Sequence, residues 1–498
     1  MSEANDEIRV VVAIDFGTTY SGYAYAHKEQ PDVIIVQDSW KEYESRFKTP
    51  TVVKYYDNYS DIKLWGYPAL IEKPKLKKAR LFSSSKLPKS SSAPIELFKL
   101  HLLKSIKGSE KPTLPRKLNY KNVIRDFMKK LGDDVKTCLK KTWQSLDPER
   151  NVLYILTVPA EFDDEAIATF RECVFNAGLL KDEESNNIRF ITEPKAAAIH
   201  CLNLVVQNLT PGDSFMIVDC GGGTVDLTTC ELLEDERLSE LTECTGDCCG
   251  SSRIDEAFLE FVGEKVGKSA IESVRKNHYG QLQYFVQEFC SQVKLPFRND
   301  EGMQHDIDLE ESLPAIMNYV KGEERERLND SEWIIEINST DIKNMFDPVI
   351  NKILSLIGEQ LDKSEKKCSA IFLVGGFSES KYLQYRIRRE FCKIPNISVP
   401  PHPTTSVVKG GVLYGLEEII KDRTYGIETE IDPYMRRNDI PISPTLFISS
   451  DDTTASHFSC KDDSASLMSI RPALLSQNSK KSQDILLNKH KIILGDFI

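Results

Sequence analysis

The stretch Val218-Asp219-Cys220-Gly221-Gly222-Gly223-Thr224-Val225-Asp226 decides the fold class of this chain. The apolar run before it, from Phe215, is typical of a buried strand, and residues 225–232 are expected to return as a second strand. A glycine turn between two strands can present backbone N–H groups to a phosphate, because glycine has no Cβ. A plain hairpin is the alternative interpretation. The flanking Asp219 and Asp226 favour phosphate binding, since carboxylate oxygens are ligands that Mg²⁺ prefers.

The same pattern occurs near the N-terminus. Residues 10–14 form a β-branched apolar run, Asp15-Phe16-Gly17-Thr18-Thr19 follows at its end, and residues 21–26 are expected to return as a strand. Gly17 alone would be interpreted as a hairpin turn, but the two copies together favour a phosphate and Mg²⁺ site between them. A repeat at this distance predicts two related lobes rather than a solenoid, whose repeats are about 20–50 residues long. Neither turn continues into the Gly-Lys-Ser/Thr of a Walker loop.

Strands and helices alternate elsewhere in the chain, which predicts doubly wound α/β sheets. The expected strands are 152–158, 188–192 and 370–374, and the expected helices are 163–177, one opening at Pro194, and 378–391. Glu193 lies between a strand and a helix, so it is either close to the water shell of a metal or a simple cap of the helix. Gly375-Gly376 either approaches a flat ligand closely or forms an ordinary turn between strand and helix.

Composition excludes several classes of protein. The chain has 498 residues, 40% of them hydrophobic and 28% charged, with a formal net charge of −12. This balance is typical of a globular protein, and the acidic surface disfavours general nucleic-acid binding. No apolar run approaches the ~18 residues that span a bilayer, and the N-terminus lacks a basic signal region. We therefore expect no membrane span, reduced cysteines, and a cytoplasmic or nuclear location.

Five motifs resemble those of the 70-kDa heat-shock protein family, in the order and at roughly the spacing of that family. They are Ile14–Ser21, Thr157–Phe162, Thr192–Ala198, Val218–Asp226 and Leu373–Gly376. The resemblance covers about residues 8 to 420. It implies a two-lobed actin-like ATPase, which is a duplicated ribonuclease H-like α/β fold, with ATP or ADP and Mg²⁺ between the lobes.

The resemblance also implies roles for individual residues. Asp219, Glu193 and Asp226 would be catalytic, and Asp15 and Asp219 would hold the metal through water. The nucleotide would be bound by Gly17, Thr18, Thr19, Tyr20, Gly221, Gly222, Gly223, Thr224, Lys294, Gly375 and Gly376.

The chain departs from the family pattern at the expected phosphate lysine. Leu70 stands where the family has a Lys four residues after a Gly, and a leucine can neither position an attacking water nor balance phosphate charge. Lys73 and Lys75 lie close by, but at the wrong spacing. With this departure, the sequence resembles the divergent heat-shock 70 kDa protein 12 type more than a general chaperone of the family.

The adenosine pocket departs as well. Lys294 fits a family lysine, whereas Ser291 and Leu295 stand where Glu and Arg are expected, and Glu379 stands where the family has an Arg that stacks on the base. Phe377 either offers a ring in its place or belongs to the core.

We expect lobe I at 8–205, lobe II at 206–422, and a degenerate or truncated C-terminal region at 423–498 that is too short for the family's peptide-binding domain and lid. Three functions remain open. The chain is a slow Mg-dependent ATPase switch that passes lobe closure to a protein partner, a non-catalytic nucleotide-gated adaptor, or a small-molecule kinase or actin-like filament protein. The Glu193-Pro194 segment favours the heat-shock branch over the third function.

Overall fold

The computed structural model describes residues 8–41, 43–74, 92–106, 111–205, 209–234, 238–242, 244–300, 302–364 and 366–425. These ranges all lie in one compact unit, residues 1–449. The predicted C-terminal region 423–498 lies almost wholly outside the described residues, as does Lys75.

Two groups of elements follow one another along the chain. The first comprises β1 (Val10–Phe16), β2 (Tyr20–His27), β3 (Ile35–Val36), β4 (Thr49–Pro50), β5 (Val53–Tyr55), β6 (Ile62–Trp65), α1 (Tyr67–Leu70), η3 (Phe98–Leu102), α2 (Tyr120–Thr142), β7 (Val152–Val158), α3 (Asp164–Asn176), β8 (Ile188–Thr192) and α4 (Glu193–Val205). The second comprises β9 (Ser214–Cys220), β10 (Val225–Leu232), β11 (Leu238–Glu240), β12 (Thr245–Asp247), α5 (Ser252–Val266), α6 (Lys268–Asn277), α7 (Tyr279–Phe289), η6 (Cys290–Lys294), β13 (Gln304–Asp308), α8 (Leu309–Ser312), η7 (Pro314–Asn318), α9 (Gly322–Asp330), β14 (Ile334–Asn338), α10 (Ser339–Lys363), β15 (Cys368–Val374), η8 (Gly376–Glu379), α11 (Lys381–Glu390), β16 (Asn396–Ser398), η9 (Pro403–Thr405) and α12 (Ser406–Tyr425).

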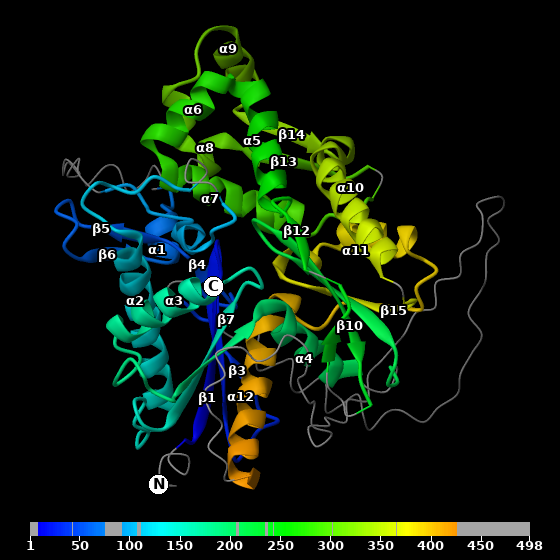
Figure 1. Cartoon of the computed structure of the whole chain (residues 1–498). Coiled ribbons are helices and arrows are strands. Elements are labelled where there is room, and N and C mark those ends of the chain that lie inside the picture. The colour runs from blue at the N-terminus through cyan, green and yellow to red at the C-terminus, as the bar shows by residue number, and fades with distance from the viewer. Residues whose placement is uncertain are drawn as a thin grey trace, which may run out of the picture. The chain divides into compact units, whose positions relative to one another are not determined.

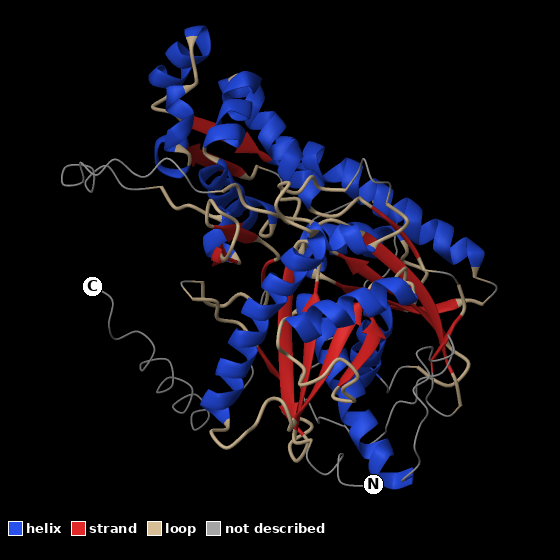
Figure 2. Cartoon of the chain, turned by 60° about the vertical axis from the view of Figure 1, so that its left-hand side comes forward, coloured by secondary structure: helices blue, strands red, loops and turns tan. Residues whose placement is uncertain are grey.

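The two large sheets have the same topology. The strand order is β3-β2-β1-β7-β8 in the first and β11-β10-β9-β15-β16 in the second. In each, an antiparallel hairpin is followed by two parallel strands, joined through helices. Figure 2 shows the strands with helices packed around them. The predicted duplication into two related α/β lobes is therefore present, one lobe around each sheet.

Side-chain alternation along the first strand of each sheet points both aspartates to the inner faces. In β1, Val10, Val12 and Ile14 belong to the outer core of the first lobe, while Val11 and Ala13 belong to a central core shared with the second sheet. In β9, Met216 and Val218 face outward, and Phe215 and Ile217 face the same central core. Because the side-chain period of a strand is two, Asp15 and Asp219 continue the inward-facing rows.

Helices α4 and α12 fill the space between the two sheets. They pack on each other, and α12 also packs on β1 and β7, which run beside it in Figure 1. Helix α12 approaches α4 very closely, because a Cβ on Gly410 would lie 1.7 Å from the carbonyl oxygen of Ala196. It approaches β1 closely as well, because a Cβ on Gly415 would lie 2.5 Å from the Val11 side chain. The lobe boundaries at 205 and 422 stay a prediction, and α12, at the end of the second range, packs on the sheet of the first.

Most predicted elements form where the sequence pattern indicates them. The expected strands 152–158 and 188–192 are β7 and β8, and 225–232 is β10. The helix expected at 378–391 is split, because Gly376–Glu379 forms a 3-10 turn before α11 begins at Lys381. Ser380 caps α11 through its side chain, which accepts from the N–H of Leu383.

Candidate functional site

The first glycine turn, Gly17–Thr19, joins β1 to β2 and is held in place by Thr51. The Thr51 hydroxyl donates to the carbonyl oxygen of Gly17 at 2.8 Å, and its backbone N–H donates to that of Thr19 at 2.8 Å. A Cβ on Gly17 would lie 2.1 Å from the carbonyl oxygen of Tyr20, so this turn can close only around a glycine. Asp15, near the end of β1, therefore lies directly beside this turn.

The second glycine turn, Gly221–Thr224, joins β9 to β10 and is supported from behind by residues 250–252. Backbone N–H groups of this segment donate to carbonyl oxygens of the turn: Ser251 to Gly221 at 3.1 Å, and Ser252 to Gly222 at 2.8 Å. These bonds draw the turn's carbonyl oxygens toward the support segment, which favours exposing its N–H groups on the opposite side.

The two turns face each other at close range. A Cβ on Gly222 would lie 3.0 Å from the hydroxyl oxygen of Thr19, and one on Gly223 would lie 3.9 Å from the Thr19 methyl group. The sequence predicted this pairing from the repeated motif, and the fold brings it about because both turns follow the inward-facing first strand of their sheets.

Four carboxylates gather beneath the turns. Asp219 and Asp226 are cross-strand partners on β9 and β10, and Glu193 is the first residue of α4. Burial raises the pKa of Asp219 to about 7; Lys48 lowers it, and Glu193 and then Asp15 raise it. Burial, and after it the charge of Asp219, raises the pKa of Asp226 to about 7. The hydrogen bond that Asp226 accepts from the Thr224 hydroxyl, at 2.9 Å, acts in the opposite direction and lowers this pKa. The cluster thus carries more negative charge than its surroundings balance.

Lys48, which the sequence reasoning missed, pairs with Asp15. Its Nζ lies 2.5 Å from Asp15 Oδ2, and only 20% of its side chain and 5% of that of Asp15 are exposed. Burial lowers the pKa of Lys48, but the Asp15 carboxylate and its hydrogen bond outweigh this, so the pKa is raised. Lys48 directly precedes β4, which pairs with β2 at Ser21, and this pairing brings the lysine to the turn.

Lys99, also missed, pairs with Glu193. Its Nζ donates to Glu193 Oε1 at 2.8 Å, its side chain is 2% exposed, and it lies over the rings of Phe16 and Phe162 at 5.7 and 5.8 Å. Burial raises the pKa of Glu193, whereas Lys99 lowers it. A signal was available in the sequence, because Lys99 is a lone cation inside an apolar run, and such a cation is usually paired when buried.

Leu70, at the expected position of the phosphate lysine, is buried in the outer core of the first lobe. Lys73 lies over the ring of Tyr43 at 5.3 Å, so it does not enter the carboxylate cluster. The cations of the site are therefore supplied by residues 48 and 99, on either side of the predicted position in the chain.

The donor set fits a hard divalent cation. The carboxylates of Asp15, Asp219, Asp226 and Glu193 lie close enough for their charges to act on one another, and oxygen donors of this kind suit Mg²⁺. Over the described ranges, no three His, Cys, Asp or Glu side chains converge closely enough to hold an ion by themselves. A metal at this place would accordingly complete its coordination with water and phosphate oxygens.

Gly375 lies against the carboxylate cluster, and its contact with a nucleotide stays a prediction. Its φ is +82°, and a Cβ there would lie 2.2 Å from Asp219 Oδ1. Gly376 begins η8, where a Cβ would lie 3.7 Å from the Thr404 hydroxyl. Phe377 is 2% exposed and packs on Phe346 at 6.3 Å, so it belongs to the core rather than to a base-stacking position.

Lys294 forms hydrogen bonds with residues of the second lobe. Its Nζ donates to Asp255 Oδ1 at 2.6 Å and to the carbonyl oxygen of Ser251 at 2.8 Å. Ser251 belongs to the segment that supports the second glycine turn, so Lys294 stabilises that turn from behind. Its direct contact with a nucleotide stays a prediction.

Several contacts join the two lobes outside the glycine turns. Gln287 Nε2 donates to the Tyr20 hydroxyl oxygen at 3.2 Å, and the backbone N–H of Glu72 donates to the carbonyl oxygen of Gly280 at 3.0 Å. The rings of Phe47 and His402 lie 4.7 Å apart. Glu96 and Tyr279 form a further contact, a side-chain hydrogen bond. Burial raises the pKa of Glu96, and this hydrogen bond offsets only part of the rise.

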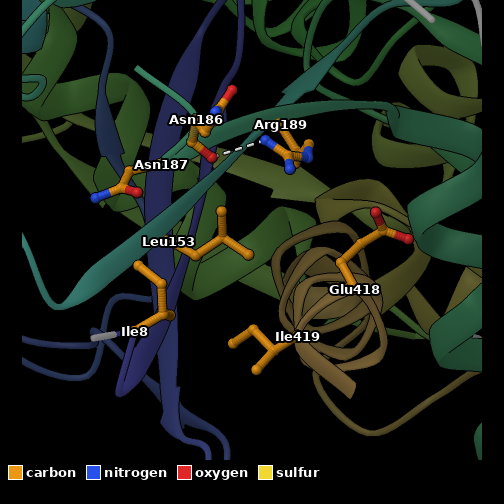
Figure 3. Close-up of a pocket in the computed structure, with 7 residues that line it drawn as sticks. All are labelled: Ile8, Leu153, Asn186, Asn187, Arg189, Glu418 and Ile419. Atoms are coloured by element: carbon orange, nitrogen blue, oxygen red, sulfur yellow. Dashed lines mark hydrogen bonds between the residues drawn. The ribbon is translucent and has the colours of Figure 1, made fainter. Parts of the chain in front are cut away.

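A separate small pocket lies at the opposite end of β7 from the glycine turns (Figure 3). Leu153 and Ile419 form its apolar side. The Arg189 guanidinium there donates to the carbonyl oxygens of Asn186 at 2.7 Å and Ile188 at 3.0 Å. The guanidinium of Arg189 therefore holds the chain at the start of β8.

Comparison with known proteins agrees with this geometry. Relatives include heat shock 70 kDa protein 12A of Mus musculus, 26% identical over 84% of this chain and 72% of the relative. Heat shock 70 kDa protein 12B of Homo sapiens is 24% identical over 82% of this chain and 68% of the relative. Chaperone protein HscA of Photorhabdus laumondii is 24% identical over 83% of this chain and 60% of the relative. In the part of the chain that the structure describes, no helix is long and apolar enough to cross a membrane.

The family model described as Hsp70 protein matches residues 11–439, which includes both glycine turns and all four carboxylates. This family is an actin-like ATPase family that binds adenine nucleotides, in agreement with the two duplicated lobes and the facing turns. The chain belongs to the Hsp70 protein family, with the two-lobed actin-like ATPase fold predicted from its sequence.

Proposed function

We propose that this chain is a slow Mg-dependent ATPase that works as a nucleotide-driven conformational switch. The observation that carries the proposal is the pair of glycine turns that face each other over four carboxylates, with Thr19 and Gly222 in near contact. Nucleotide phosphates between the turns would accept N–H bonds from both lobes and so hold them together. Lobe closure would then pass to a protein partner as a hinge motion.

The chain's own residues divide the work of hydrolysis. Glu193 orients and accepts a proton from the attacking water, and Lys99 fixes the position of its carboxylate. Asp226, held by the Thr224 hydroxyl, and Asp219 orient water molecules in the cluster. Mg²⁺, when bound through water at Asp15 and Asp219, supplies charge neutralisation to the phosphates.

Replacing Glu193 by glutamine tests the catalytic part of the proposal. Loss of a general base typically lowers turnover by about 100- to 10,000-fold. We expect phosphate release from ATP to fall to the background of the assay, while ATP still binds within about threefold of wild type because the glycine turns are intact. Single-turnover phosphate release and a binding titration on the same preparation measure both quantities.

The second candidate function is a nucleotide-gated adaptor without hydrolysis. Two observations favour it. The position of the usual phosphate lysine is taken by the buried, uncharged Leu70. The charge of Asp15 is balanced by its ion pair with Lys48. Wild-type phosphate release equal to that of the Glu193→Gln protein, with nucleotide binding retained in both, would establish the adaptor and refute the ATPase.

A further inference from the structure

Lys48 has an unusual place for a cation in a site that is expected to hold a metal. Its Nζ lies 2.5 Å from Asp15 Oδ2, and the Thr157 hydroxyl donates to the other oxygen, Oδ1, at 3.5 Å. Both carboxylate oxygens of Asp15 therefore already face a hydrogen-bond donor. The negative charges of Asp219 and Glu193 also help to raise the pKa of Lys48, in addition to that of Asp15.

The backbone keeps Lys48 there. The residue precedes β4, whose Thr49 pairs with Ser21, and Thr51 at the other end of β4 is bonded to Gly17 and Thr19. On the other side, Phe47 packs against His402 across the cleft. Backbone pairing and the bonds of Thr51 thus fix the position of Lys48 relative to the first glycine turn.

An ammonium group so placed has two consequences. It carries three N–H donors, of which one is directed to Asp15, so the others are available to phosphate oxygens between the turns. It also repels a divalent cation that approaches Asp15, because like charges a few ångströms apart in a partly buried site oppose each other strongly.

We propose that Lys48 is a resident cation of the phosphate site, which lets this chain bind nucleotide phosphates with little dependence on Mg²⁺. The proposal rests on the nucleotide site proposed above and deepens it. Binding and hydrolysis then have separate cation requirements: Lys48 serves binding, and a metal held through water beside Asp219 would serve the chemistry.

The test compares the dissociation constant of ADP in excess EDTA with that in millimolar MgCl₂, by titration calorimetry on the full chain. For wild type, we expect the two constants to agree within roughly threefold. For Lys48→Gln, which leaves Asp15 uncompensated beside the phosphates, we expect the constant in EDTA to exceed that in Mg²⁺ by about tenfold or more. Lys48→Arg keeps the charge and should behave as wild type.

Lys73→Gln is the matched control, because Lys73 lies over Tyr43 and away from the cluster. It should leave the EDTA-to-Mg²⁺ ratio unchanged. A wild-type ratio as large as that of Lys48→Gln would overturn the role of Lys48 while leaving nucleotide binding intact. Absence of ADP binding to wild type in both buffers would instead overturn the nucleotide site, and the proposal for Lys48 with it. If Lys48→Gln unfolds, the wild-type ratio and that of Lys48→Arg still decide the matter.

Discussion

Replacing Lys99 by methionine is expected to abolish phosphate release while the nucleotide still binds. Methionine is about as long as lysine and fits between Phe16 and Phe162, but it has no charge. Burial already raises the pKa of Glu193, and Lys99 is the group that lowers it most. Without that cation, the pKa of Glu193 rises further, which disfavours the carboxylate that must accept a proton from water, so turnover falls by about 100-fold or more.

The same substitution also lowers the free energy of unfolding. Removing one partner of a buried ion pair typically costs about 3–5 kcal/mol; we expect the lower end, because Glu193 keeps 23% of its side chain exposed and can take up a proton. A double-mutant cycle with Glu193→Gln measures the coupling. The double variant should be more stable than Lys99→Met alone, since both charges are then gone. Wild-type turnover in Lys99→Met, or additive effects on stability, would contradict the assigned role.

Replacing Gly410 by alanine is expected to give the largest loss of stability. The new Cβ would lie 1.7 Å from the Ala196 carbonyl oxygen and 2.5 Å from its carbon, and both belong to the α4 backbone, which cannot swing aside as a side chain does. The two helices must therefore separate, which disrupts the central core between the sheets. The cost exceeds about 3 kcal/mol, the upper part of the range for overpacking.

Gly358→Ala is the matched control for this prediction. Gly358 also lies in a helix, α10, but a Cβ there meets nothing within 4 Å. Alanine is the better helix former by about 0.5–1 kcal/mol, so this variant should be as stable as wild type or slightly more so. Thermal unfolding of the two variants and wild type provides the comparison. Equal midpoints for Gly410→Ala and Gly358→Ala would show that α12 does not pack on α4 as closely as described.

Much of the fold could be predicted because its signals are local. The apolar runs that became β7, β8 and β10 have strand length and are bounded by turns or proline, and the repeat of an aspartate and a glycine turn after a strand predicted the two facing glycine turns. Period-two alternation then suffices to direct Asp15 and Asp219 inward.

The rest of the site depends on contacts between distant residues. Lys99 is 94 positions from Glu193, and Lys48 is 33 from Asp15. No motif spacing links these pairs; β4 pairing and the turn η3 bring them together. The family pattern places the cation at Leu70, with Lys73 and Lys75 close by, whereas the lone cation in the apolar run around residue 99 was the more informative sequence feature.

Titration calorimetry of wild type and Gly222→Val with ATP and Mg²⁺ tests the central claim most directly. The valine side chain would project toward Thr19 and fill the space between the two turns, whereas Gly222 has no positive φ, so the backbone itself is not strained. We expect one ATP to bind per wild-type chain and binding to be weakened by about tenfold or more in the variant, with thermal unfolding little changed. No binding of ATP to wild type, or equal binding to both proteins, would contradict a nucleotide site between the glycine turns.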